Sequence, residues 1–242
     1  MKATEVFTPG TLPEHTYYDR EELRLEWRLL EAIETKGFIS SVSGPSKSGK
    51  TVLCETVVGK RKMLIVTGGG IAVEEQFWRK LRQKLGLPVA TRRERGREKG
   101  GEFGGKAAAG MQVPLLAEGK VELDGKLKDS KSSAEGFDYE GPDGTELLEH
   151  IGDKGFTLVV DDFHYIDRAV QKSLAEQFKE AARQGATIVV VSVSHRSDDA
   201  IRANPDLRGR VASIDIPYWD DSELRVIAEK GFPFMNMEPD PA

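Results

Sequence analysis

The sequence predicts an α/β fold, in which a doubly wound, mostly parallel five-stranded sheet is flanked by helices. Short apolar runs alternate with helical segments before residue 91 and after residue 155. One apolar run leads into a loop of the pattern G-x-x-x-x-G-K-[ST] at residues 44–51, and another ends in Asp161 and Asp162. In an open α/β sheet, both features are expected at the carboxyl ends of the strands, where such folds bind their ligands.

A first helix is expected between Asp19, which would be its N-cap with Glu22 as capping-box partner, and Gly37. Four apolar residues recur there at helical spacing and form the face that we expect to be buried: Leu23, Trp27, Leu30 and Ile33. The apolar run 38–43 then predicts the first strand, which leads directly into the glycine-rich loop.

The glycine-rich loop has the chemistry needed to bind a nucleoside triphosphate. Backbone N–H groups at a helix N-terminus can bind phosphate oxygens, and Gly44 and Gly49 let the backbone curl around them. Lys50 is expected to reach the β and γ phosphates, and the Thr51 hydroxyl to ligate Mg²⁺. We expect nucleotide contacts from the loop and the residue after it: Gly44, Pro45, Ser46, Lys47, Ser48, Gly49, Lys50, Thr51 and Val52. A short helix over 52–58 should follow and end at Gly59.

The second half of the predicted site lies at residues 157–162, where an apolar run ends in two acids. This pattern predicts a buried parallel strand that delivers carboxylates to the carboxyl edge of the sheet. Asp161 is the expected Mg²⁺-side carboxylate, and Asp162 is placed to polarise the water that attacks the γ phosphate. Alone, the two acids would equally fit a strand end followed by a turn, but the phosphate-binding loop favours the catalytic interpretation.

The remaining elements follow from their apolar periodicity. Strands are expected at 63–67, 186–193 and 211–216. A helix after 68–70 would bury Val73, Phe77, Leu81 and Leu85. A helix capped by Asp167 and ended by Gly185 would bury Val170, Leu174, Phe178 and Ala181. A last helix is expected over 221–230, ended by Gly231.

From about residue 91 to residue 155 the periodicity is lost, and we expect a loop-rich insertion before the acidic strand. Residues 111–123 could pair as a β-hairpin. The basic cluster at 92–106 could contact nucleic acid, but its interleaved acids favour a solvated loop.

Four segments are therefore predicted. Residues 1–36 form an N-terminal segment with an adenine-side helix, 37–90 and 156–231 form the core, 91–155 form the insertion, and 232–242 begin a missing lid or tail.

The composition narrows the protein class. The net charge of -5 argues against a protein that coats nucleic acid, and the single cysteine, Cys54, excludes an internal disulfide and a cysteine-based zinc site. Cys54 is expected to be a small core side chain. The sequence shows neither the apolar core of a signal peptide nor a run of about 18 apolar residues, so we expect a cytoplasmic protein without a membrane span.

These landmarks, in this order, resemble the P-loop ATPases of the AAA+ and STAND class, in which a further strand lies between the phosphate-loop strand and the acidic strand. The resemblance covers about residues 17–90 and 156–231. It implies that Tyr18 and Arg20 lie near the adenine, and that Arg196, at the end of the fourth strand, senses the γ phosphate. It also implies that Arg208 or Arg210 is the arginine finger that completes a neighbouring subunit's site. The catalytic residues would then be Lys50, Asp162, Arg196 and Arg210.

Two features depart from that pattern. The acids Asp161 and Asp162 replace the usual Asp-Glu of AAA+ proteins and are nearer the STAND variant, whose slow hydrolysis serves as a switch. The chain also ends eleven residues after Gly231, at residue 242, so the helical lid that usually follows is nearly absent. We expect a fragment, because residues 232–237 are rich in apolar side chains suited to burial against missing structure.

The leading hypothesis is a switch that binds and hydrolyses Mg-ATP, releases ADP, and assembles as a homo-oligomer or larger complex, for example in bacterial defence or signalling. The alternative is a DNA-linked AAA+ adaptor that resembles transposition or replication loaders, with 92–106 as its contact. A small-molecule kinase is disfavoured because no basic lid for a second substrate is visible. Trp219 is expected to be a packing anchor, and His164 to orient the site or to satisfy a loop backbone.

Overall fold

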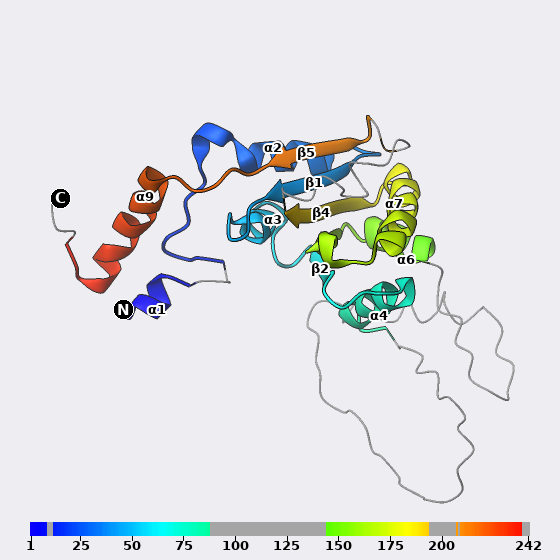
Figure 1. Ribbon diagram of the computed structural model, residues 1–242, viewed down its shortest axis with the longest axis horizontal. Helices are drawn as coiled ribbons and strands as arrows, with labels where there is room; N and C mark the ends of the chain where they lie inside the picture. The colour runs from blue at the N-terminus through cyan, green and yellow to red at the C-terminus, as the bar shows by residue number, and fades with distance from the viewer. Residues whose placement is uncertain (9–11, 88–143, 194–206, 208, 239–242) are drawn as a thin grey trace, which may run out of the picture.

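The computed structural model describes residues 1–8, 12–87, 144–193, 207 and 209–238 (Figure 1). Five strands form one sheet in the order β2-β3-β4-β1-β5, and each neighbouring pair is parallel. The strands are β1 Ile39–Gly44, β2 Met63–Thr67, β3 Thr157–Asp161, β4 Thr187–Val193 and β5 Val211–Asp215. The predicted five-stranded parallel sheet is confirmed, and β4 lies between β1 and β3 as the resemblance implied.

The three central strands are buried on both faces because helices cover both sides of the sheet. Successive residues alternate between the faces, so that Val160 belongs to the core under one layer of helices and Val159 to the core under the other. The pairing register brings Gly44 of β1 level with Val193 of β4, and Asp161 of β3 level with Thr67 of β2. The carboxyl ends of these strands therefore meet at one edge.

The two helical layers differ in size. The larger layer contains α4 Glu74–Lys84, α6 Gly144–Asp153 and α7 Arg168–Arg183, and buries Phe77, Leu148 and Phe178. The smaller contains α2 Leu25–Glu34 and α3 Lys50–Val58. The helix α9 Asp221–Gly231 and the short helix α1 Ala3–Val6 lie at one end of the molecule (Figure 1). None of the helices in the described ranges is both long and apolar enough to cross a membrane.

The predicted buried face of the first helix is wrong at Trp27 and Leu30, whereas Leu23 and Ile33 are partly buried against the core. Trp27 is 56% exposed and Leu30 is 42% exposed, whereas Leu25, Leu29 and Ala32 are buried against the sheet. Asp19 does not cap this helix. Arg20 and Arg24, both in the left-handed region with φ of 52° and 49°, precede the 3-10 helix Glu21–Leu23 and α2 respectively. Because of these two turns, α2 faces the sheet with a different set of side chains from the set that the sequence predicted.

The apolar stripe of α4 also differs from the expected one at its first turn. Val73 is the N-cap residue and 55% exposed, while Trp78, which the stripe left out, is 4% exposed. The Trp78 indole packs edge-on against Phe77 and donates a hydrogen bond to Glu74 at 2.9 Å. An indole can thus be buried at this position because its N–H finds an acceptor within its own helix.

Helix α6 falls within the range 91–155 that the sequence assigned to a loop-rich insertion. Its residues Leu147, Leu148 and Ile151 are each at most 1% exposed and belong to the larger core. Apolar spacing over only ten residues, next to a charged glycine-rich stretch, predicts a helix only weakly. In the folded protein, contacts with α7 and β3 stabilise this helix. The hairpin expected at 111–123 and the basic cluster at 92–106 lie outside the described residues.

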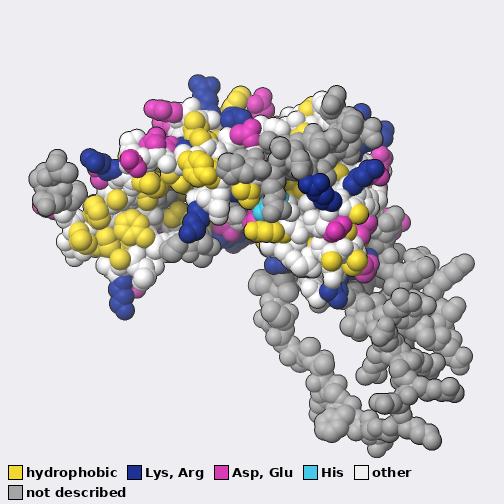
Figure 2. Space-filling model, in the orientation of Figure 1, with side chains coloured by type: hydrophobic (Ala, Val, Ile, Leu, Met, Phe, Trp, Pro, Cys, Tyr) yellow, Lys and Arg dark blue, Asp and Glu magenta, His cyan; other side chains and the backbone are white. Residues whose placement is uncertain are grey.

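The N-terminal segment packs against the end of α9. Gly231 is the last residue of this α-helix, within one residue of the predicted end, but it is buried with helical φ and ψ, and the chain continues as the 3-10 helix Phe232–Met235. A Cβ atom on Gly231 would lie 2.3 Å from the Phe7 ring, so glycine is required by this close contact. Apolar side chains gather over this end of the molecule, where Leu224, Phe234 and Met237 are exposed (Figure 2).

Candidate functional site

The loop 44–51 connects β1 to α3 at the carboxyl edge of the sheet. Its residues Lys47 and Gly49 have φ values of 64° and 90°. Alternation of such left-handed residues with right-handed ones turns successive N–H groups toward one point and forms an anion-binding concavity. The N-terminus of α3, which begins at Lys50, adds its positive dipole end to the same concavity.

Within this loop the Lys50 ammonium donates hydrogen bonds to the carbonyl oxygens of Gly44, at 3.0 Å, and Pro45, at 2.6 Å. Burial lowers the pKa of Lys50, and the negative charges of Asp161 and Asp162 oppose this shift without cancelling it. The ammonium therefore lies between the loop and the two acids, as expected for a cation that binds phosphate there.

Thr51 and Asp161, which the sequence assigns to Mg²⁺, are brought together by the fold. The Thr51 hydroxyl donates a hydrogen bond of 2.8 Å to Asp161, across 110 positions of sequence. In the described part of the chain, no group of three or more His, Cys, Asp or Glu side chains is placed to hold a metal ion. Mg²⁺ is usually bound by one or two protein ligands together with substrate phosphates and water, so this hydroxyl and carboxylate suit it.

Asp162 follows β3 in a left-handed conformation with φ of 56°. Its N–H donates to the Asp161 carboxylate at 2.8 Å, and its carbonyl lies against Gly68 after β2, where a Cβ atom would approach it to 2.4 Å. The Gly68 N–H donates to the Asp161 carbonyl at 2.8 Å. Asp162 is thus held at the sheet edge, next to Asp161 and against the residue that follows β2.

A pocket of about 560 Å³ opens beside the phosphate loop, between the core, the N-terminal segment and α9. Its walls include the loop residues Lys47, Ser48 and Gly49 and the first turns of α3, at Val52 and Leu53. Apolar residues of the segment between β5 and α9, and of α9 itself, close the other side: Ile216, Trp219, Leu224 and Ile227. A mostly apolar pocket that continues into an anion-binding loop suits a nucleoside linked to phosphates.

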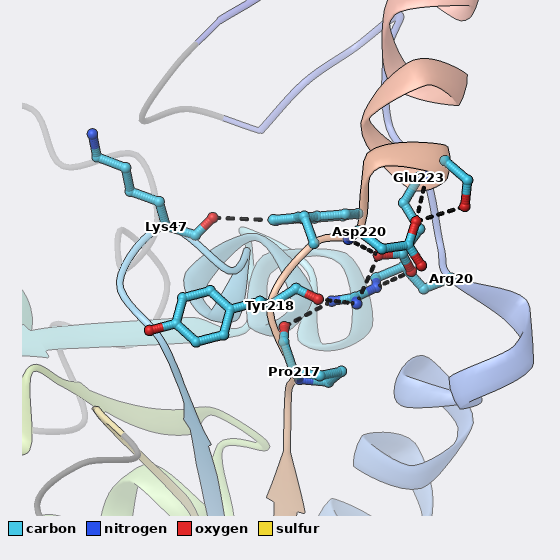
Figure 3. Close-up of polar contacts among 8 residues, drawn as sticks. Arg20, Lys47, Pro217, Tyr218, Asp220 and Glu223 are labelled. Atoms are coloured by element: carbon cyan, nitrogen blue, oxygen red, sulfur yellow. Dashed lines mark hydrogen bonds and ion pairs between the residues drawn. The ribbon is translucent and has the colours of Figure 1, made fainter.

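Tyr18 and Arg20, which the resemblance would place near the adenine, both line this pocket. Arg20 is only 4% exposed, and its guanidinium donates four hydrogen bonds to residues 217–223. It forms an ion pair with Glu223 of α9, with N–O distances of 2.6 and 2.9 Å, and donates to the carbonyls of Pro217 and Tyr218 (Figure 3). Arg20 therefore builds the pocket wall by joining the N-terminal segment to α9.

Trp219 has a contact that its sequence context did not predict. Its indole N–H donates to the carbonyl oxygen of Lys47 at 3.2 Å, and the Arg20 guanidinium lies 4.4 Å from the centre of its ring. The expected role of packing anchor misses this direct hydrogen bond to the phosphate loop. No local pattern could have signalled a contact between residues 172 positions apart.

Of the three arginines assigned to sensing or to a neighbour's site, Arg210 belongs to the described residues and does not line this pocket. Arg196 and Arg208 lie outside the described residues. Arg210 is exposed and precedes β5, and its carbonyl accepts a hydrogen bond from Ile39 at the amino end of β1. Because β1 and β5 are parallel, roughly 16 Å of strand separates Arg210 from the phosphate loop of its own chain.

Cys54 is completely buried in α3, and burial raises the pKa of its thiol to about 12. The thiol is therefore a core side chain, as expected, and would not act as a nucleophile near neutral pH.

The loop shows a direct sign of fit to an anion. Ser48 is 4% exposed, and its hydroxyl is buried without a hydrogen-bond partner among the described residues. An unsatisfied buried hydroxyl is unfavourable, and this one lines the pocket, where it can donate to a ligand oxygen. Together with the Lys50 ammonium, it makes the residues of this loop chemically suited to a nucleotide phosphate.

Comparison with known proteins supports this architecture. No family model matches the sequence, and neither does any curated protein. Among solved structures, Cdc6p from Pyrobaculum aerophilum is similar, with a TM-score of 0.54 and 15% identity over 95% of this chain and 54% of that chain. A STAND protein with a tetratricopeptide repeat sensor from Pyrococcus horikoshii matches with a TM-score of 0.49 and 15% identity, over 88% of this chain and 25% of that chain.

RuvB from Thermotoga maritima matches more loosely, with a TM-score of 0.38 and 13% identity over 89% of this chain and 51% of that chain. This chain thus spans about half the length of the Cdc6p structure, 54%. The parallel sheet, its flanking helices and the phosphate-binding loop together form a P-loop NTPase fold.

Proposed function

We propose that this protein binds Mg-ATP and hydrolyses its β–γ phosphoanhydride bond, and that the nucleotide state acts as a switch. The observation that carries the proposal is the meeting of the phosphate loop, the Thr51–Asp161 pair and the apolar pocket at one edge of the sheet. Tyr18 of the N-terminal segment and Trp219 would line the nucleoside end of the site. The loop N–H groups, Ser48 and Lys50 would bind the phosphates.

The chemistry requires little more than positioning and charge stabilisation. Thr51 and Asp161 would hold Mg²⁺, which when bound neutralises charge on the phosphate oxygens. Asp162 would accept a proton from the attacking water, because it lies one residue beyond the metal-side acid at the same edge. In this scheme, Asp161 contributes to Mg-ATP binding and Asp162 to ATP turnover.

Contacts between the pocket and the ends of the chain support the switch. The Arg20–Glu223 pair, and the hydrogen bond from Lys230 to the Tyr17 carbonyl at 2.8 Å, join the N-terminal wall of the pocket to α9. A nucleotide that binds one arrangement of these walls more tightly would shift α9 toward it. We propose that this movement controls an assembly of several copies in the cytoplasm, in the manner of AAA+ and STAND proteins in signalling or defence.

The Lys50→Ala variant tests the proposal. Loss of the ammonium should weaken Mg-ATP binding at least about tenfold, because a charge-assisted contact with the phosphates contributes about 2–4 kcal/mol in a closed site. Isothermal titration calorimetry measures the affinity. Lys60→Ala, which removes an exposed lysine just after α3, is the matched control and should bind ATP normally. Equal affinity of Lys50→Ala and the wild type would refute the phosphate-binding role of the loop.

A further inference from the structure

The segment 216–220, which joins β5 to α9, contacts the phosphate loop directly. The Trp219 indole N–H donates to the Lys47 carbonyl oxygen at 3.2 Å. The indole also lies against the loop two residues further on, because its Cζ2 atom is 3.6 Å from the position that a Cβ atom on Gly49 would occupy. Trp219 thus contacts Lys47 and lies beside Gly49, on either side of Ser48.

Lys47 is a position where the loop needs such support. Its φ of 64° lies in the left-handed region, which is unfavourable for a residue with a Cβ atom. Yet a left-handed residue in such a loop helps to turn the loop N–H groups toward one point. The Lys47 side chain points away from the cluster around Arg20 (Figure 3), so its backbone carbonyl makes the contact.

Trp219 is itself held in place from the opposite side. The Arg20 guanidinium lies 4.4 Å from the centre of the indole ring and is fixed by the carbonyls of Pro217 and Tyr218 and by Glu223. Arg20 is 4% exposed and its hydrogen bonds are partly buried, so the guanidinium is held against the face of the half-exposed indole. On this side the indole is therefore positioned by a fixed group of the protein itself.

We propose that Trp219 is a positioning residue for phosphate binding: through the Lys47 carbonyl it holds the loop in its phosphate-binding curvature. The inference rests on the proposed nucleotide function and adds a residue to it. A tryptophan at this pocket could also serve simply as an apolar surface for the base. The two roles differ in which part of the nucleotide would lose affinity when the indole N–H is removed.

The experiment compares Trp219→Phe with the wild type in calorimetric titrations with Mg-ATP and with inorganic tripolyphosphate, which has no base. Phenylalanine retains an aromatic face but cannot donate to Lys47. If Trp219 positions the loop, both ligands should bind more weakly by a similar factor, about three- to tenfold for one lost hydrogen bond. If it only contacts the base, tripolyphosphate affinity should stay unchanged, which would overturn the proposal.

Controls separate this inference from the proposed function. Trp27→Phe, at an exposed tryptophan on α2, should leave both affinities unchanged, whereas Lys50→Ala should weaken both. If the wild type binds neither ligand, the proposed function fails and this inference fails with it. If the wild type binds both and Trp219→Phe does too with equal affinity, only the inference fails. A lower unfolding temperature of Trp219→Phe does not affect the conclusion. The losses of affinity for Mg-ATP and for tripolyphosphate are both measured on folded protein, and their ratio distinguishes the two roles.

Discussion

At the scale of single residues, Lys50 and Thr51 are hydrogen-bonded within the site, while the Ser48 hydroxyl has no partner among the described residues. Lys50 contacts two carbonyls of its own loop, and Thr51 contacts Asp161. Phosphate binding would require Lys50 to exchange these carbonyl oxygens for phosphate oxygens, while the Thr51–Asp161 pair would open to admit Mg²⁺. The Asp162 carboxylate takes no part in these hydrogen bonds of Lys50 and Thr51, which is why its role can be tested separately.

The Asp162→Asn variant should bind Mg-ATP with wild-type affinity but turn it over about 10²-fold more slowly, since an amide cannot accept the proton from water. Steady-state phosphate release and calorimetric binding, measured on the same preparation, test this separation. Asp161→Asn is the informative comparison, because it should weaken Mg²⁺-dependent binding as well. Normal turnover by Asp162→Asn would assign water activation to another group.

At the scale of elements, the site depends on how β2 and β3 end side by side. The N–H of Gly68, just after β2, donates to Asp161 at the end of β3, and Lys80 of α4 donates to the carbonyls of Thr67 and Gly69. The turn after β2 is therefore held by hydrogen bonds to both β3 and α4. This turn supports the left-handed conformation of Asp162 by leaving space for its carbonyl.

Gly68→Ala should disturb this junction, because its Cβ atom would lie 2.4 Å from the Asp162 carbonyl oxygen and backbone atoms cannot move aside cheaply. We expect a loss of about 1–3 kcal/mol in the free energy of unfolding, as for other overpacked sites, together with slower ATP turnover. Gly69→Ala is the matched control, since a Cβ atom there has no neighbour within 4 Å. Denaturant unfolding that is the same for both variants would contradict the proposed packing.

The segment between α4 and α6 gives a second test at this scale. Replacement of residues 92–110 by a short Gly/Ser linker should leave the melting temperature nearly unchanged, because this stretch has few residues suited to a core. In contrast, Leu148→Ala in α6 should cost about 2–5 kcal/mol, because Leu148 is completely buried. A large loss of stability in the linker variant would show that residues 92–110 pack on the sheet.

At the scale of the whole molecule, residues that we assign to catalysis lie at two opposite edges of the sheet. The phosphate loop and the acids lie at the carboxyl ends of the strands, whereas Arg210 lies at the amino end of β5, on the opposite edge. A guanidinium at that position is too far away to reach the phosphates of its own chain. If Arg210 acts in catalysis, it must do so on the nucleotide of a second copy, and turnover must then depend on association.

ATP turnover per molecule should therefore rise with protein concentration, since an arginine supplied across an interface can increase turnover by about 10³-fold or more. Arg210→Ala should keep its ATP affinity but lose this concentration dependence. Mixing Arg210→Ala with Asp162→Asn protein should restore part of the activity, because a mixed interface can combine an intact acid with an intact arginine. Turnover that is independent of concentration, with no rescue on mixing, would show Arg210 to be an ordinary surface residue.

Short patterns in the sequence determined the architecture of this protein: five strands, the phosphate loop and the acidic strand. The spacing of apolar residues and the composition of loops favour a strand, helix or turn within a few residues, through backbone sterics and burial. These elements can therefore be predicted from the sequence alone. The same patterns predicted that Lys50, Thr51 and Asp161 share one sheet edge, because parallel strands end together.

Tertiary structure alone decided which face of α2 is buried, that α6 forms within the expected insertion, and that Arg20 joins α9 through Glu223, 203 positions away. It also decided that Trp219 contacts Lys47. Such contacts depend on packing between distant segments and on small rotations at turns such as Arg24, where φ is 49°. A pattern that spans neighbouring residues contains no information about those distances, so only the folded chain defines the walls of the pocket.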